Sequence, residues 1–182
     1  MRVRTRLAAA VLASLLSSSC LVVSLQPVYE PETIAFDPAL LGSWASADDD
    51  LTVTFERGEW HSYHLTLEQR DDRYRLSARM TRIGAGLYLD VTPLDGTDMP
   101  ALTLPVHGCL RVELIDESLS LAELDYEWFE RQRGEAKLAL PFVVDARRNV
   151  VITAGTTELR QWIAQHSPAE GVFAAPTTFT RR

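Results

Sequence analysis

Apolar and polar residues alternate one by one through four consecutive segments of this chain, 51–56, 63–68, 73–80 and 87–92. A period of two places the apolar side chains on one face of a β-strand and the polar side chains on the other. Short segments containing glycine or aspartate separate the four runs. Strands joined in this way form an antiparallel meander with one face in the core and one in water. The pattern therefore predicts a mainly β fold.

The second half of the chain continues this pattern and adds two helices. Residues 125–134 begin with Asp125, a good helix cap, and end at a glycine. Residues 156–166 place three apolar side chains on one helical face. The further expected strands are 102–107, 109–115, 118–124, 149–154 and 177–181. Together these elements predict an antiparallel meander that forms a barrel or half-barrel with two short helices.

The N-terminal segment has the features of an export signal. Basic residues occupy positions 2, 4 and 6, residues 7–16 carry no charge, and three serines precede Cys20. A basic region, a short apolar region and small residues at the cleavage point are typical of a secretory signal peptide. A cysteine directly after the small residues resembles the lipobox of bacterial lipoproteins, which implies that Cys20 is lipidated and becomes the mature N-terminus. We therefore expect a signal peptide at 1–19, a lipidated tether at 20–38 and one β domain at 39–182.

Two alternatives remain open for this segment. Residues 7–25 form an uncharged stretch of 19 residues, close to the ~20 that an uncleaved transmembrane anchor needs. The chain has two cysteines, so a disulfide between Cys20 and Cys109 is possible if Cys20 is not lipidated. If Cys20 is lipidated, Cys109 is left alone, and its strand-like surroundings favour a small buried residue over a reactive thiol.

The charge of the mature chain restricts its partners. Three of the 18 basic residues lie within 1–19, so residues 20–182 carry 15 basic and 25 acidic side chains, a formal net charge of −10. Such a chain is not expected to bind nucleic acid or to dock electrostatically on anionic lipid. The expected attachment to a membrane is the N-terminal lipid.

The sequence Gly42-Ser43-Trp44 resembles the Gly-x-Trp motif that opens the first strand of lipocalins. The resemblance implies that Trp44 closes one end of a lipocalin-like barrel and that an arginine of the last strand packs across it. Arg181 and Arg182 are the candidates, and Arg181 is the residue that we assign to barrel closure with Gly42 and Trp44. We predict a cation–π contact with less than about 6 Å between guanidinium and ring.

A wider resemblance covers residues 24–30, 36–44, 124–129 and 151–159, which are similar to a family of small bacterial envelope lipoproteins. That family has no established activity, so the resemblance implies a location and a single domain and transfers no catalytic residue. It places the protein at the cell envelope, facing the periplasm or the exterior. Leu21 stands where an aspartate would, by resemblance to enteric lipoproteins, retain the protein in the inner membrane, so the outer membrane is preferred.

No residue pattern indicates an enzyme, a metal site or a cofactor. His61 and His64 are three positions apart, so a strand would point them to opposite faces. His107 and Cys109 share a strand face, but two ligands make an incomplete metal site. Thiol catalysis would need Cys109 to be exposed with a lowered pKa.

Two functions fit these features. A closed β-barrel can hold a small hydrophobic ligand, in a cavity that the inward-facing residues would line. The same residues can instead fill the core of a structural lipoprotein that docks on an envelope protein partner. The residues concerned are Tyr63, Leu65, Leu67, Tyr74, Leu76, Met80, Leu87 and Leu89.

Overall fold

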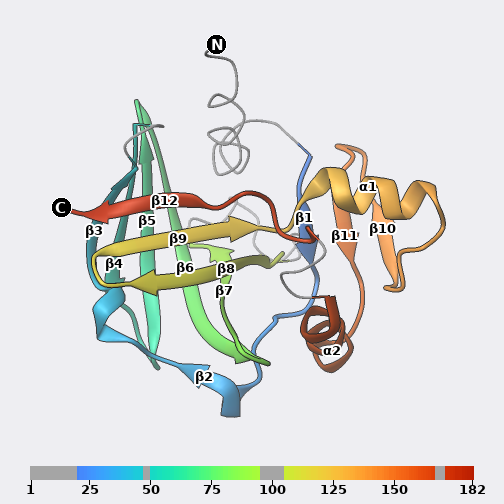
Figure 1. Ribbon diagram of the computed structural model, residues 1–182, viewed down its shortest axis with the longest axis horizontal. Coiled ribbons are helices and arrows are strands. Elements are labelled where there is room, and N and C mark those ends of the chain that lie inside the picture. Colours follow the sequence, from blue (N-terminus) through green and yellow to red (C-terminus); the bar gives the residue numbers. More distant parts are fainter. Residues whose placement is uncertain (1–19, 47–49, 95–104, 167–170) are drawn as a thin grey trace.

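The computed structural model describes residues 20–46, 50–94, 105–166 and 171–182, so the expected signal peptide at 1–19 lies outside the described residues. Eight antiparallel strands form a closed barrel in the order β6, β5, β4, β3, β12, β9, β8 and β7, and β7 pairs back to β6 (Figure 1). Their bounds are β3 (Gly42–Ser46), β4 (Leu51–Arg57), β5 (Ser62–Gln69), β6 (Asp72–Ile83), β7 (Gly86–Pro93), β8 (Gly108–Ile115), β9 (Ser118–Glu123) and β12 (Thr177–Arg181). The predicted fold class, a mainly β lipocalin-like barrel with two short helices, is confirmed.

The apolar face of each strand points into the barrel. Residues opposite each other on paired strands share a face, and Val53, Leu67 and Tyr74 are successive partners across β4, β5 and β6. The same register continues around the ring, so one apolar core fills much of the interior. Its largest fully buried side chains include Trp44, Phe55, Tyr63, Leu65, Leu89, Leu119, Leu121 and Phe179.

A second layer covers the outside of the barrel. Strands β1 (Val22–Ser24), β11 (Val150–Ile152) and β10 (Phe142–Val144) form a small sheet in that order. This sheet and the helices α1 (Tyr126–Gly134) and α2 (Thr156–His166) lie on one side of the barrel (Figure 1). Their apolar side chains form a second core with outward-facing residues of the barrel wall. The wall residues in this core include Ile83, Tyr88, Cys109 and Ala122, and the helical residues are Trp128, Phe129, Leu159, Trp162 and Ile163.

Both predicted helices are present. Asp125 caps α1, because its Oδ1 accepts a hydrogen bond of 2.6 Å from the backbone N–H of Trp128. Half of the predicted strand at 102–107 lies outside the described residues, and in the other half His107 makes an isolated bridge with Ser24. The short strand β10 was not predicted, because its three residues are all apolar and therefore show no alternation.

The segment 20–38 differs from the tether that we expected. Its strand β1 pairs in parallel with β11, and β2 (Ile34–Ala35) pairs with β6. Val28 is 1% exposed, and Arg160 of α2 donates hydrogen bonds to the carbonyl oxygens of Val28 (2.7 Å) and Arg82 (3.0 Å). The prolines do extend the chain locally, but the segment packs along the barrel and α2 instead of standing free.

Candidate ligand pocket in the barrel

The two ends of the barrel are built differently. One end contains the start of β3 and the end of β12, and the other contains the ends of β5 and β7 and the starts of β6 and β8. Trp44 lies at the first end with no exposed surface, and its indole Nε1 donates a 2.9 Å hydrogen bond to the carbonyl oxygen of Leu40. A buried tryptophan with a satisfied N–H is a rigid plug, so this end is closed.

Arg181 completes the closed end. Its guanidinium carbon lies 4.2 Å from the centroid of the Trp44 ring, well inside the limit for a cation–π contact. The same guanidinium donates hydrogen bonds to the carbonyl oxygens of Leu41 (2.8 Å) and Ala39. Gly42 has a φ of +116°, and a Cβ there would approach the Arg181 guanidinium to 3.0 Å. Glycine is therefore needed to bring β3 close to the arginine.

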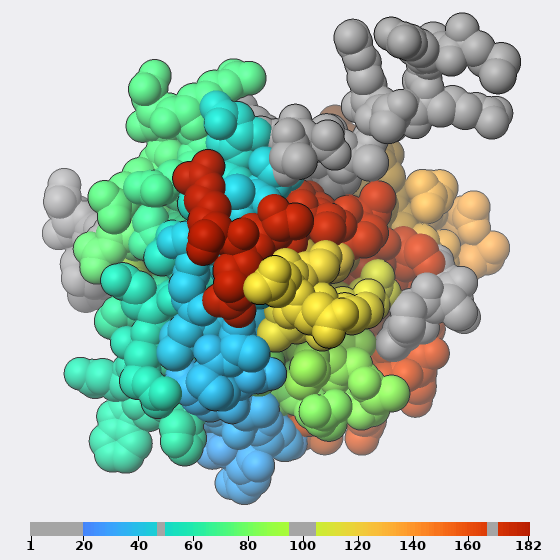
Figure 2. Space-filling view, turned by 60° about the vertical axis from the view of Figure 1, so that its left-hand side comes forward, coloured from blue at the N-terminus to red at the C-terminus, as the bar shows by residue number. Residues whose placement is uncertain are grey.

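Strand β12 holds this arginine in place. In Figure 2, β12 lies in red across the surface between yellow β9 and blue β3. Arg181 is the cross-strand partner of Trp44, and the backbone N–H of Arg182 donates a 2.9 Å hydrogen bond to the carbonyl oxygen of Ser43. The end of the chain is thus fixed at the closed end of the barrel.

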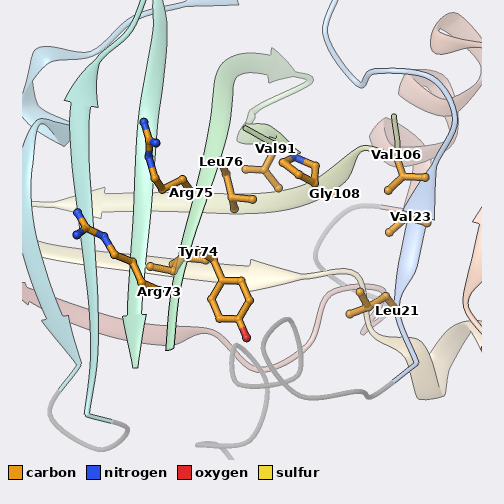
Figure 3. A pocket seen from close by; sticks show the side chains of 11 residues that line it. Leu21, Val23, Arg73, Tyr74, Arg75, Leu76, Val91, Val106 and Gly108 are labelled. Atoms are coloured by element: carbon orange, nitrogen blue, oxygen red, sulfur yellow. The ribbon is translucent and has the colours of Figure 1, made fainter. Parts of the chain in front are cut away.

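The opposite end contains an apolar pocket of about 320 Å³. Small-molecule sites in proteins are typically clefts of about 300–1,000 Å³ with mainly apolar walls, so this pocket is of the size for one small ligand. Its walls come from the barrel and from the N-terminal segment (Figure 3). The lining residues include Leu67, Tyr74, Leu76, Val91 and Pro93 of the barrel, and Leu21, Val23 and Val106 beside it.

Polar groups contribute little to this pocket. Arg73 and Arg75 of β6 also line it, but both guanidinium groups point away from the space that the apolar side chains enclose (Figure 3). Arg73 instead forms an exposed ion pair with Glu68 at 3.4 Å. The Tyr74 ring reaches toward the pocket with its hydroxyl at the tip (Figure 3). The pocket is therefore suited to a hydrocarbon group and not to a charged one.

The residues proposed to line a cavity separate into two groups. Leu67, Tyr74 and Leu76 line the pocket. Tyr63, Leu65, Met80 and Leu89 fill the interior instead, with Tyr63 and Leu89 at 0% exposure, and Leu87 packs against them. The sequence prediction missed Leu21, Val23 and Val106, because these residues come from outside the barrel strands. The packed centre and the open end therefore coexist in one barrel.

Cys20 stands next to this pocket. It directly precedes Leu21, and its Sγ lies 3.7 Å from the carbonyl oxygen of Arg147 in the turn between β10 and β11. The backbone N–H of Leu21 donates a 2.9 Å hydrogen bond to Oδ1 of Asn149, and its carbonyl oxygen accepts one of 2.8 Å from Val150. Both cysteines are free thiols.

Cys109 is a buried residue of the second core, as predicted. Its side chain faces outward from β8 beneath the second layer and is 5% exposed. Burial, and to a lesser extent the nearby Asp90 carboxylate, raises the pKa of its thiol. A raised pKa keeps the thiol protonated and unreactive near neutral pH, so this residue does not meet the requirement for thiol catalysis.

We predict that one thiol per chain reacts in the folded protein. At about pH 8, Ellman's reagent should modify the half-buried Cys20 and leave Cys109 intact, whereas both should react in denaturant. The measurement is the absorbance of the thionitrobenzoate released per chain of residues 20–182. Cys20→Ser is the matched control, and it should release none while folded. Rapid native reaction of this variant would contradict the burial of Cys109.

His107 makes a contact that the sequence did not reveal. Its Nδ1 lies 2.7 Å from Oδ1 of Asp90, which is 2% exposed, and Oδ2 of Asp90 accepts a 2.8 Å hydrogen bond from the backbone N–H of Val28. His107 also exchanges two backbone hydrogen bonds with Ser24. Asp90 and His107 thus fasten the N-terminal segment to β7 and the start of β8.

Metal-binding groups do not assemble in the described parts of the chain. No group of three or more His, Cys, Asp or Glu side chains there is placed to hold a metal ion. His64 lies in β5, whereas His61 precedes that strand in a left-handed conformation with a φ of 60°. Within the same ranges, each helix falls short of the length and apolarity required to cross a bilayer.

The fold and the pocket define an eight-stranded antiparallel β-barrel protein with one plugged end and an apolar pocket at the other. Comparisons with protein-family models, curated proteins and solved structures give no match to this chain. Its function therefore has to be argued from the pocket and from the N-terminal sequence.

Proposed function

We propose that this chain is an exported envelope protein, anchored through a lipid on Cys20, that holds a small hydrophobic ligand at the open end of its barrel. The pocket carries this proposal, because an apolar space of about 320 Å³ remains where the rest of the barrel is filled. The proposed role is non-catalytic. It needs no cofactor and no nucleic acid.

The N-terminal sequence supports the anchor, and the position of β1 favours a lipid over a transmembrane helix. Residues 22–24 form β1 and are part of the folded domain. The uncharged stretch available to a membrane anchor is therefore reduced to residues 7–21, which is 15 residues. A bilayer needs about 20, so an export signal that ends before Cys20 fits better.

A charge in the pocket should weaken binding of an apolar ligand. Leu76→Glu places a carboxylate among the apolar lining residues, and burying it should weaken binding of an apolar ligand about 30-fold, or about 2 kcal/mol. The measurement is a fluorescence titration of residues 20–182 with cis-parinaric acid, a straight-chain fluorescent fatty acid. Ile115→Glu is the matched control, because Ile115 is 67% exposed near the plugged end. Equal affinity of the two variants would contradict binding in this pocket.

A structural lipoprotein that docks on an envelope partner is the second candidate. The filled centre of the barrel favours it, as do the exposed side chains of Val143 (54%) and Val144 (42%) on the edge strand β10. Unpaired edge strands with apolar side chains can pair with another chain. Native mass spectrometry of protein extracted from its own envelope separates the candidates. A small molecule released on denaturation supports the ligand carrier, and acylated protein without bound mass supports the docking protein.

A further inference from the structure

The pocket and the expected lipid attachment site share one short segment of chain. Leu21 and Val23 line the pocket, and Cys20 directly precedes Leu21. Consecutive Cα atoms are about 3.8 Å apart, so Cys20 lies one residue from the pocket wall, with its Sγ directed to the carbonyl oxygen of Arg147. The other end of the chain, Arg182, lies at the plugged end of the barrel.

This arrangement is held in place from both sides. On one side, Leu21 is hydrogen-bonded to Asn149 and Val150. The Asp145 carboxylate stabilises that turn by accepting hydrogen bonds from the N–H groups of Arg147 (2.9 Å) and Asn149 (2.8 Å). On the other side, Ser24 exchanges two backbone hydrogen bonds with His107. A lipid on Cys20 would therefore hold the open end of the barrel at the bilayer surface, with no flexible tether between them.

The chemistry of the pocket specifies the ligand more narrowly. Its lining is apolar, and the nearby arginines direct their charges away from it (Figure 3). Its volume is at the lower limit of ligand sites, so one hydrocarbon chain fits better than the two chains of a phospholipid. The net charge of −10 on residues 20–182 gives no attraction to an anionic head group. Recognition would thus rest on a single tail, with the head group left outside.

We infer that the pocket takes up the single acyl chain of a membrane lipid directly from the bilayer to which Cys20 anchors the protein. This inference rests on the proposed function and adds both the class of ligand and its route. The bilayer concentrates acyl chains at the pocket entrance, which raises the encounter rate without any new contact. A ligand entering through water would gain nothing from the position of the anchor.

The test compares two anchor positions on the same barrel. The Cys20 thiol adds across the double bond of a maleimide-functionalised phospholipid. The thioether that forms attaches residues 20–182 to vesicles. The buried Cys109 should not compete. The matched protein carries Cys20→Ser and Arg182→Cys, which moves the same anchor to the plugged end. Vesicles containing cis-parinaric acid report loading by energy transfer from the protein's tryptophans.

We expect the Cys20-anchored protein to load about tenfold faster, or more, than the Arg182→Cys-anchored protein. The variant Leu76→Glu anchored at Cys20 should bind about 30-fold more weakly and load correspondingly less. Equal loading rates from both anchor positions would overturn the inference and leave the proposed function intact, provided that the soluble Cys20→Ser protein binds the fatty acid. If that soluble protein does not bind it, both the inference and the ligand-carrier function are rejected.

Discussion

Trp44→Ala should lower the free energy of unfolding by about 3–5 kcal/mol, the usual cost of removing a large aromatic side chain from a core. The Trp44 side chain has no exposed surface, donates a hydrogen bond to Leu40 and supports the Arg181 guanidinium at 4.2 Å. Alanine would leave a cavity at the plugged end and remove the ring that the cation contacts. Urea unfolding of residues 20–182, followed by circular dichroism, measures the change.

Trp60→Ala is the control for this prediction. Trp60 is 86% exposed in the turn between β4 and β5, so its loss should change the unfolding free energy by no more than about 0.5 kcal/mol. Both variants remove the same atoms, so a difference between their unfolding free energies reflects the burial of Trp44. Similar stabilities of the two variants would mean that Trp44 does not plug the barrel.

The barrel could be predicted because its information is local. Alternation along 51–92 determines which side chains face inward, and glycine or aspartate marks the turns. The paired strands β4 to β7 follow each other directly along the chain. The motif at Gly42 and Trp44 also marked the strand that lies at the plugged end. A meander of this kind needs no long-range information beyond its closure by β12.

The N-terminal segment could not be predicted in the same way. Val22 to Ser24 form only three residues of strand, and their partner β11 lies 128 positions further along the chain. The three X-Pro steps in 26–38 read as an extended linker, because proline restricts the residue before it. Extended backbone is also what a strand requires, so local conformation did not distinguish a tether from β1.

The pocket was predictable only in part. Inward-facing apolar residues look alike in sequence whether they fill a barrel or line a space, as Leu65 and Leu76 illustrate: the first is 1% exposed and the second lines the pocket. The two residues are cross-strand partners, so what separates them is the packing around each one in the closed barrel, which the sequence pattern does not show. Leu21 and Val23 could not be predicted as pocket walls, because their segment is placed by pairing with the distant strand β11.

The Asp90–His107 contact also depends on pairing between strands. The sequence placed His107 with Cys109 on one face, but the cross-strand partner of Cys109 is Asp90. A signal was present in β7, because Tyr88 on the same outward face as Asp90 is a large aromatic residue and is fully buried. A large aromatic residue on the outward face of a strand indicates that this face is covered.

Asp90→Ala should lower the free energy of unfolding by about 3–4 kcal/mol, because it breaks a buried polar network on one side only. The Val28 N–H and the His107 ring would each lose the carboxylate oxygen that they contact at 2.8 and 2.7 Å. The loss should be greatest in the N-terminal segment, so amide hydrogen exchange at Val28 and Ser24 should accelerate more than exchange in β4. Loosening this segment would also move Val23 and Leu21 from the pocket wall and weaken binding of cis-parinaric acid.

Asp71→Ala provides the matched control, since Asp71 is exposed in the turn between β5 and β6 and its loss should alter stability by no more than about 0.5 kcal/mol. The two variants remove the same carboxylate, so a difference between them measures the buried network. If Asp90→Ala lowers stability but exchange at Val28 stays as slow as in β4, the carboxylate supports the barrel as a whole and does not fasten the N-terminal segment. If exchange at Val28 accelerates selectively and ligand affinity falls with it, the segment next to Cys20 is both a structural strand and a wall of the pocket.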